Sequence, residues 1–160
     1  MDFEIVKYTK EYLNDIYNIW SEAIDEGLTL PWKEPFNLEK TKYIISTQIE
    51  CFCAVNDQNC VGFYILHPNG SGRCEHISNA LYIVKKQYRR QGIDTALVKH
   101  SLQKAKEHNF KAMQYNSVVA GNDSVCVYFK LGFEKAGNIP NGFRLNDNKY
   151  EDLFILYKKL

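Results

Sequence analysis

The segment Arg-Arg-Gln-Gly-Ile-Asp, residues 89–94, combines residue types that can bind an anion. It follows an apolar stretch, residues 77–84, and opens a segment with helical periodicity, residues 91–108. The N–H groups of a first helical turn have no partner within the helix, and the helix dipole adds partial positive charge there. Gly92 lets an anion approach the backbone, and guanidinium groups can bind phosphate oxygens. The pattern predicts either a phosphate or pyrophosphate site or an ordinary solvated helix cap.

A second such pattern is Ser-Val-Cys-Val-Tyr-Phe-Lys-Leu-Gly-Phe, residues 124–133. Tyr128 lies one turn before the expected end of a short helix, and Gly132 and Phe133 turn the chain into a strand. A phenol can donate a proton to a leaving group. The alternative is a core tyrosine whose hydroxyl is satisfied by a backbone carbonyl. The residues alone leave both interpretations open.

Metal binding is the chemistry that the cysteines would suggest. The candidate ligands are Cys51, Cys53, Cys74 and His76. Their spacing fits no common zinc finger or ribbon, and Cys51 and Cys53 alternate like residues on one face of a strand. We therefore expect no metal and treat the cysteines as small buried hydrophobic residues. Five cysteines without a secretory leader indicate reduced thiols.

The composition indicates one domain spanning residues 1–160, with 45% apolar and 14% aromatic residues to form a core. The net charge is +1 and has no basic stripe, which argues against a nucleic-acid partner. The N-terminus lacks the pattern of a signal peptide, and no apolar run approaches the ~20 residues that span a bilayer. We expect a soluble, cytoplasmic protein without a membrane partner.

Strands and helices are expected to alternate along the chain and to position these residues. Gly27 ends the first helix and Asn37 caps the second. The expected strands are residues 3–8, 51–55, 60–67, 77–84, 112–119, one starting at 133–136, and 152–157. The expected helices are residues 11–26, 37–48, 91–108 and 123–130. This order predicts an α/β domain of the mixed, or α+β, kind.

With both patterns in this order, about 40 residues apart, the chain resembles the GNAT superfamily of acetyl-CoA-dependent N-acetyltransferases over its whole length. That family carries Arg/Gln-x-x-Gly-x-Gly/Ala, and Arg89, Gly92 and Asp94 occupy those places. Ser124, Tyr128 and the Gly-Phe pair resemble its later signature. The resemblance implies the GNAT fold, a mixed, mostly antiparallel sheet of about seven strands. That sheet is splayed between strands 4 and 5 and flanked by about four helices.

The resemblance also implies a co-substrate and a mechanism. Acetyl-CoA would be the acetyl donor, transferring directly in a ternary complex, with Tyr128 protonating the departing thiolate and no cysteine nucleophile. The backbone near Val84 would polarise the thioester carbonyl. Glu75, His76 and a chain of waters stay open as the base. The implied cofactor contacts are Ile83, Val84, Arg89, Arg90, Gln91, Gly92, Ile93, Asp94, Thr95, Ser124 and Tyr128.

Four further stretches resemble the subgroup that contains the yeast proline-analogue N-acetyltransferases: residues 68–73, 76–80, 114–119 and 137–144. In that subgroup the asparagines matching Asn79 and Asn116 line the acceptor site. Amides both donate and accept hydrogen bonds, so they suit a zwitterionic amine, although both residues can also cap local turns. The loops 29–36 and 138–144 are expected to complete the acceptor pocket. Arg144 either binds a substrate carboxylate there or lies on the surface.

Two positions depart from the family's pattern and keep alternatives open. Asp94 stands where a small residue is usual, and the expected asparagine falls on Gly121, with Asn122 one place late. The principal expectation is acetylation of a small-molecule amine resembling an amino or imino acid. The alternatives are a protein N-terminal or lysine acetyltransferase, and a catalytically weak domain that binds or regulates. Nucleic-acid binding is a more distant alternative, and a homodimer stays open.

Overall fold

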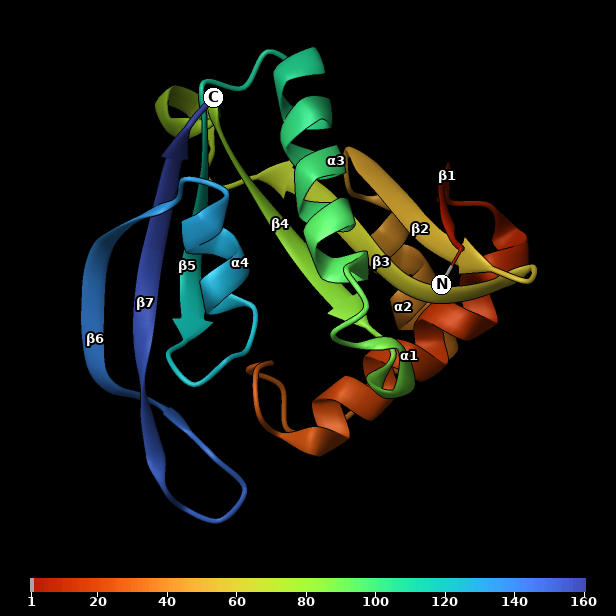
Figure 1. Ribbon diagram of the computed structural model, residues 1–160, viewed down its shortest axis with the longest axis horizontal. Helices are drawn as coiled ribbons and strands as arrows, with labels where there is room; N and C mark the ends of the chain where they lie inside the picture. Colours follow the sequence, from red (N-terminus) through yellow and green to blue (C-terminus); the bar gives the residue numbers. More distant parts are fainter. Residues whose placement is uncertain (1) are drawn as a thin grey trace.

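The computed structural model describes residues 2–160, and its centre is a seven-stranded sheet with the order β1-β2-β3-β4-β5-β7-β6 (Figure 1). Every neighbouring pair is antiparallel except β4 and β5, which are parallel. The strands are β1 (Glu4–Lys7), β2 (Glu50–Asn56), β3 (Asn59–Pro68), β4 (Ile77–Val84), β5 (Ala112–Val119), β6 (Glu134–Arg144) and β7 (Tyr150–Lys159). The α-helices are α1 (Leu13–Glu26), α2 (Leu38–Ser46), α3 (Ile93–Glu107) and α4 (Val125–Lys130). Short 3-10 helices are η1 (Lys10–Tyr12), η2 (Gly72–Cys74) and η3 (Lys86–Tyr88).

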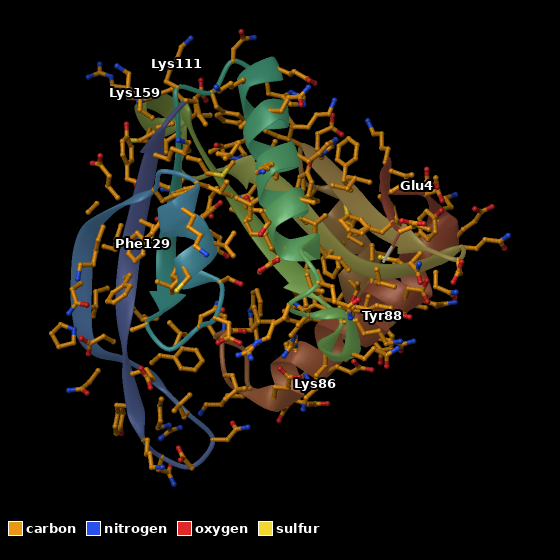
Figure 2. All side chains as sticks on the ribbon, viewed as in Figure 1. Glu4, Lys86, Tyr88, Lys111, Phe129 and Lys159 are labelled. Atoms are coloured by element: carbon orange, nitrogen blue, oxygen red, sulfur yellow. The ribbon has the colours of Figure 1, made fainter. Side chains whose placement is uncertain are left out.

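Helices cover both faces of the sheet, which divides the core into two clusters. The cluster under α3 and α4 includes Tyr82, Leu97 and Tyr128, and the cluster under α1 and α2 includes Trp20 and Ile83. In Figure 1, α3 and α4 lie in front of the sheet. Because side chains alternate along a strand, β4 contributes to both clusters with successive residues. Figure 2 shows Lys111 and Lys159 together at one end of the molecule, where β5 begins and β7 ends.

The ends of the first two helices follow from their local sequence. Gly27 adopts φ +63° after α1, a left-handed conformation that costs glycine little, and its N–H bonds to the Ile24 carbonyl. Asn37 caps α2 by accepting a 2.8 Å hydrogen bond from the Lys40 N–H. The Asn146 side chain, from the β6–β7 turn, donates to the last carbonyls of α1, those of Asp25 and Glu26. The C-terminal hairpin is thereby fastened to the end of α1.

The sheet splits between β4 and β5. These strands pair only at Ile77 with Ala112 and at Ser78 with Met113, and then diverge toward their carboxyl ends (Figure 1). The buried Ser78 hydroxyl donates to the Ala112 carbonyl at the narrow end of this wedge. On the far side of β5, the register to β7 shifts between Tyr115 and Val118. The divergence leaves a gap in the middle of the sheet.

The predicted α/β class, the order of helices and strands along the chain and the splay after β4 are confirmed. The prediction of a loop at 138–144 is wrong, because β6 extends to Arg144 and pairs with β7 through two irregularities. Cys74 was expected to be buried but is exposed in η2, whereas Cys51 and Cys53 are buried on β2. α3 and α4 start two residues later than predicted, at Ile93 and Val125. Within residues 2–160, no helix is long and apolar enough to cross a membrane.

Gly27→Ala is expected to lower the free energy of unfolding by about 1–2 kcal/mol from left-handed backbone strain alone, measured by urea denaturation. The added Cβ would also collide with the Asn146 side chain, which increases the loss. In an Asn146→Ala background only the backbone strain remains, so the loss from Gly27→Ala should shrink there. Equal losses of unfolding free energy in both backgrounds would show that contact with the Asn146 side chain adds nothing to the cost of Gly27→Ala.

Candidate functional site

Two cavities open into the wedge between β4 and β5. One, of about 400 Å³, is called the β4–α3 cavity here, because Val84, Arg89 and Asp94 line it where β4 leads into α3. The other, of about 370 Å³, is called the amide cavity, because Gln48, Asn79 and Asn116 line it. Five residues line both cavities and mark where they meet: Thr29, Tyr82, Val119, Asn122 and Tyr128. The site therefore has two chambers, joined across the sheet at Tyr128.

The start of α3 lies at the wide end of the wedge. Gly92 is the N-cap residue with φ +84°, and as a glycine it has no side chain to cap the helix. The space around Gly92 is open, since a Cβ built on it would meet no atom within 4 Å. Ile93 is 1% exposed and anchors the turn in the core, so only its backbone can face a ligand. The exposed N–H groups and the helix dipole make this turn an anion-binding position.

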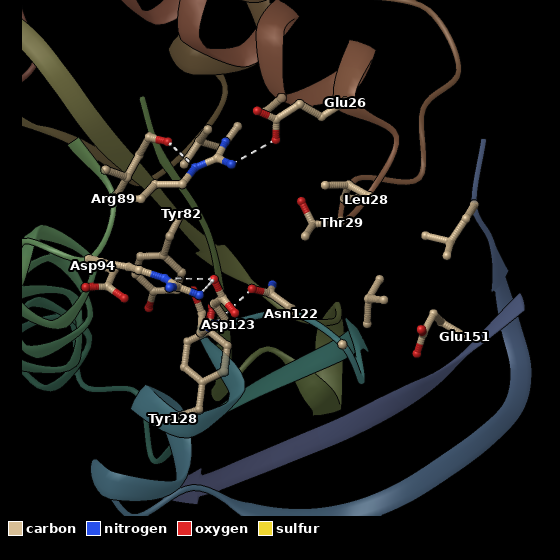
Figure 3. Close-up of a pocket in the computed structure, with 18 residues that line it drawn as sticks. Glu26, Leu28, Thr29, Tyr82, Arg89, Asp94, Asn122, Asp123, Tyr128 and Glu151 are labelled. Atoms are coloured by element: carbon tan, nitrogen blue, oxygen red, sulfur yellow. Dashed lines mark hydrogen bonds and ion pairs between the residues drawn. The ribbon is translucent and has the colours of Figure 1, made fainter. Parts of the chain in front are cut away.

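Both arginines of the predicted phosphate segment already have protein partners. Arg89 donates from Nε to the Val84 carbonyl (3.1 Å) and from an Nη to Glu26 (2.9 Å), across the β4–α3 cavity wall (Figure 3). Arg90 has a left-handed φ of +60° and pairs with Asp123 at 3.0 Å. The Arg90 pair is exposed and contributes little to stability, so a stronger anion can compete for this guanidinium. Arg89 is the better-held group and positions the end of α1 against β4.

Carboxylates outnumber guanidinium groups around the β4–α3 cavity. The four acids are Glu26, Asp94, Asp123 and Glu151, against the two arginines (Figure 3). Asp94 turns one oxygen back to the first turn of α3, where Oδ1 accepts a 2.8 Å hydrogen bond from the Thr95 N–H. The Asp94 side chain thus satisfies one of the amides that a bound anion would use. This charge distribution opposes a polyanion, while the open backbone at Gly92 favours one.

Tyr128 is 7% exposed and is held in place by aromatic rings. Its ring centroid lies 4.8 Å from that of Tyr115 and 5.8 Å from that of Phe133. Burial raises the pKa of Tyr128 well above its ordinary value, and electrostatic interactions with Tyr82 and with the Asp94 carboxylate add to the shift. The phenol therefore keeps its proton throughout the neutral range and can act as a proton donor.

A second phenol, Tyr82, spans the gap in the sheet. The Tyr82 hydroxyl lies 2.8 Å from the Tyr115 hydroxyl on β5 and 2.6 Å from the Ser101 hydroxyl on α3. Burial raises the pKa of both phenols, so neither ionises near neutrality. These hydrogen bonds join β4, β5 and α3 at the point where the two strands no longer pair.

The predicted acceptor residues Asn79 and Asn116 meet at one atom. The Nδ2 of Asn79 and the Nδ2 of Asn116 both donate to Oδ1 of Asn69, at 3.0 Å and 2.7 Å. An amide oxygen accepts two hydrogen bonds, so Oδ1 of Asn69 has no further acceptor capacity. The Nδ2 groups of Asn79 and Asn116 each keep a second N–H. Asn69 belongs to the β3–β4 connection, and it holds β4 and β5 residues together near the narrow end of the wedge.

The rest of the amide cavity is mainly apolar and aromatic. The rings of Trp20 and Trp32 meet edge to face, with centroids 5.9 Å apart, and Leu30, Pro31 and Ile44 complete this wall. Among the described residues that line the cavity, none is Asp, Glu, Lys or Arg. His67, at the end of β3, is the one imidazole among them. The chamber suits a compact molecule with an apolar body and a few polar groups.

The structure distributes the predicted site residues unevenly. Ile83, Val84, Arg89, Arg90, Asp94, Ser124 and Tyr128 line the β4–α3 cavity, but Gln91, Gly92, Ile93 and Thr95 contribute no lining side chain. The candidate bases Glu75 and His76 are exposed at the start of β4 and line neither chamber. Arg144 lines a separate cavity with Trp32 and Asn146. Thr29 belongs to the loop that was expected to complete the acceptor pocket, and it lines both chambers. Sequence reasoning missed Glu26, Asn69, Tyr82 and Glu151, which come from elements that only the fold brings together.

These features define a class of protein: an α/β domain whose sheet splits between two parallel strands beside the open first turn of a helix. The sequence profile of the Acetyltransferase (GNAT) family matches residues 13–133. The chain therefore belongs to the GNAT family of acetyltransferases.

Individual relatives agree with this assignment. Over 97 residues, 59% of this chain, it is 34% identical to N-acetyltransferase aca1 of Schizosaccharomyces pombe, but the match covers only 46% of that protein. A GCN5-related N-acetyltransferase from Kribbella flavida superposes with a TM-score of 0.93 at 23% identity, covering 99% of this chain and 98% of that one. A phosphinothricin acetyltransferase from Sinorhizobium meliloti, solved with AcCoA, gives a TM-score of 0.93 at 16% identity, covering 100% and 89%. These similarities support the GNAT fold.

Asp94→Asn is expected to tighten the binding of inorganic pyrophosphate by about two- to fivefold, because it removes a negative charge beside the first turn of α3. NMR titration of the Gly92 and Ile93 amide signals measures this affinity. The control is Asp57→Asn, the same chemical change in the β2–β3 turn, outside both chambers. Weaker binding by Asp94→Asn would show that the carboxylate supports the anion site.

Proposed function

We propose that the protein is an N-acetyltransferase that moves an acetyl group from acetyl-CoA to the amine of a small molecule resembling an amino or imino acid. The transfer is direct, within a ternary complex of enzyme and both substrates. One observation carries the proposal: the two chambers meet at Tyr128, one leading to the open turn at Gly92 where α3 starts and the other to paired amides. Donor and acceptor can therefore approach one point from opposite faces of the sheet.

The β4–α3 cavity fits the co-substrate at its backbone groups. The N–H groups of residues 92–94 would hold the pyrophosphate, and the open space at Gly92 admits it. The backbone of β4 beyond Ser78 has no β5 partner, so it can pair with the extended pantetheine arm as with another strand. The Val84 carbonyl is already bonded to Arg89, which leaves the other backbone groups of β4 for this role. Acetyl-CoA supplies an acetyl group activated as a thioester.

Tyr128 is the proposed proton donor to the departing sulfur. It lines both chambers, its ring is fixed by Tyr115 and Phe133, and its raised pKa keeps the hydroxyl protonated. The buried cysteines lie on β2 and at the start of β3, outside both chambers, which supports direct transfer without a cysteine nucleophile.

The amide cavity favours a small acceptor over a protein one. A site for lysine-rich or N-terminal peptides is expected to offer carboxylates in an open groove, and the lining here contains none. Asn79 and Asn116 each present a spare N–H that can bind a carboxylate or carbonyl oxygen of the acceptor. The wall of Trp20 and Trp32 matches an apolar body of about ring size.

One observation favours a second candidate, a GNAT domain that binds the co-substrate weakly and serves as a binding or regulatory module. The excess of carboxylates around the β4–α3 cavity opposes a polyanionic ligand. Calorimetry with acetyl-CoA separates the two candidates. Micromolar affinity supports the enzyme, whereas no binding at high micromolar concentrations supports the module.

A thiol-release assay with acetyl-CoA tests the proposed function directly. Small amino and cyclic imino acids are expected to give turnover, because they fit an uncharged chamber with two donor amides. Polyamines and lysine peptides serve as the comparison set and are expected to react at least tenfold more slowly, since no carboxylate faces their extra charges. Turnover confined to peptides would replace the small-molecule assignment with a protein acceptor.

Tyr128→Phe is expected to lower kcat about 10²-fold with little change in the KM of either substrate, because it removes only the proton donor. Steady-state kinetics with a good acceptor measures this. Tyr150→Phe, at an exposed tyrosine outside both chambers, is the matched control and should keep the wild-type kcat. An undiminished kcat for Tyr128→Phe would remove Tyr128 from the reaction.

A further inference from the structure

His67 occupies a position in the amide cavity that neither the motifs nor the proton donor accounts for. It is the next-to-last residue of β3 and lies directly opposite Asn79 of β4 in the antiparallel register. Cross-strand partners share a face of the sheet, so His67 and Asn79 stand on the side covered by α1 and α2. Both residues line the amide cavity, together with Asn116. The imidazole is therefore placed where the acceptor is expected to bind.

The local hydrogen bond of His67 fixes which ring nitrogen carries the proton. Nδ1 lies 2.9 Å from the Pro68 carbonyl oxygen. A carbonyl oxygen only accepts, so Nδ1 must be the donor, and in the neutral ring the lone pair is then on Nε2. Among residues 2–160, no side chain or backbone group hydrogen-bonds to Nε2. The ring is thus set as a proton acceptor with its accepting nitrogen unengaged.

The surroundings of His67 contain no better proton acceptor. The other titratable groups that line the amide cavity are phenols whose pKa burial raises: Tyr82, Tyr115 and Tyr128. The segment that follows α2 contributes the neutral amide of Gln48, and β5 contributes that of Asn116. The charged or titratable groups nearby in the sequence and sheet stay outside the cavity lining. These are Arg73, Glu75 and His76 in the β3–β4 connection, and Glu50 on β2, which contacts Lys7 and His108. An ammonium group in this chamber therefore finds one base, His67.

We propose that His67 accepts, through Nε2, the proton that an ammonium acceptor must lose before it can attack. This inference rests on the proposed function. The N–H bond breaks, the proton bonds to Nε2, and the electron pair stays on the amine nitrogen. His67 then returns its proton to solvent. The second nitrogen proton, lost as the amide forms, replaces the proton that Tyr128 gives to sulfur. Overall, an ammonium acceptor and a thioester yield an amide, a thiol and one proton.

His67→Gln tests the assignment through the pH dependence of kcat/KM for the acceptor. At neutral pH the variant is expected to lose about 10²-fold in kcat/KM. The loss should diminish as the pH approaches the pKa of the acceptor, because solvent then supplies the free amine. The affinity for acetyl-CoA should not change. His76→Gln is the matched control, since its Nδ1 bonds the Arg73 carbonyl in the same way but the residue lines neither chamber.

A second readout needs neither turnover nor a variant. Long-range ¹H–¹⁵N NMR of the His67 ring should show the Nδ1–H tautomer, and its Nε2 resonance should move when an amino or imino acid is added without acetyl-CoA. Wild-type kinetics in His67→Gln would overturn the proposed role of His67 while leaving the proposed function standing. An Nε2 resonance that does not move with acceptors that the enzyme acetylates would do the same. A wild-type protein that acetylates no acceptor would overturn the proposed function, and His67 with it.

Discussion

The early separation of β4 and β5 is the constraint on which the site depends. Two parallel strands joined by a helix would ordinarily pair along their lengths, yet these strands pair at only two positions. Their divergence leaves one side of β4 without backbone partners and aims the start of α3 at the opening. The hydroxyls of Tyr82, Tyr115 and Ser101 replace the missing backbone ladder on the α3 side. On the α1 side, the Asn69 side chain links the two strands, because its Oδ1 accepts hydrogen bonds from Asn79 on β4 and Asn116 on β5.

Local sequence was enough to predict the parts of the fold that depend on short-range chemistry. Gly27 ends α1 and Asn37 caps α2, because each conformation or hydrogen bond involves only residues within a turn. The start of β6 was predicted, but its continuation through residues 138–144 was missed for the opposite reason. Its segment contains Pro140 and Gly142, which favour a loop. Only pairing with β7 makes it a strand, and an edge strand with irregular register tolerates both residues.

The sequence predicted many residues of the candidate site but not the contacts between them. The spacing around Gly92 indicated an anion position, and the structure leaves that turn open. The same spacing could not show that Glu26 would engage Arg89, because these residues lie 63 positions apart. Nor could it show that Asn79 and Asn116 share one acceptor atom, since that contact exists only where the strands begin to part. Long-range geometry decides which polar groups are already satisfied and which remain for a ligand.

The alternation of side chains along β4 separates the two halves of the proposed reaction. Tyr82 and Val84 belong to the cluster under α3, whereas Leu81 and Ile83 belong to the cluster under α1, and Asn79 shares their face. A shift of register by one residue would exchange these faces and move the amide away from His67. The pairing of β3 with β4 therefore fixes the proposed acceptor chamber, independently of the start of α3. Changes in the walls of the amide cavity can then alter the choice of acceptor without disturbing the anion position at Gly92.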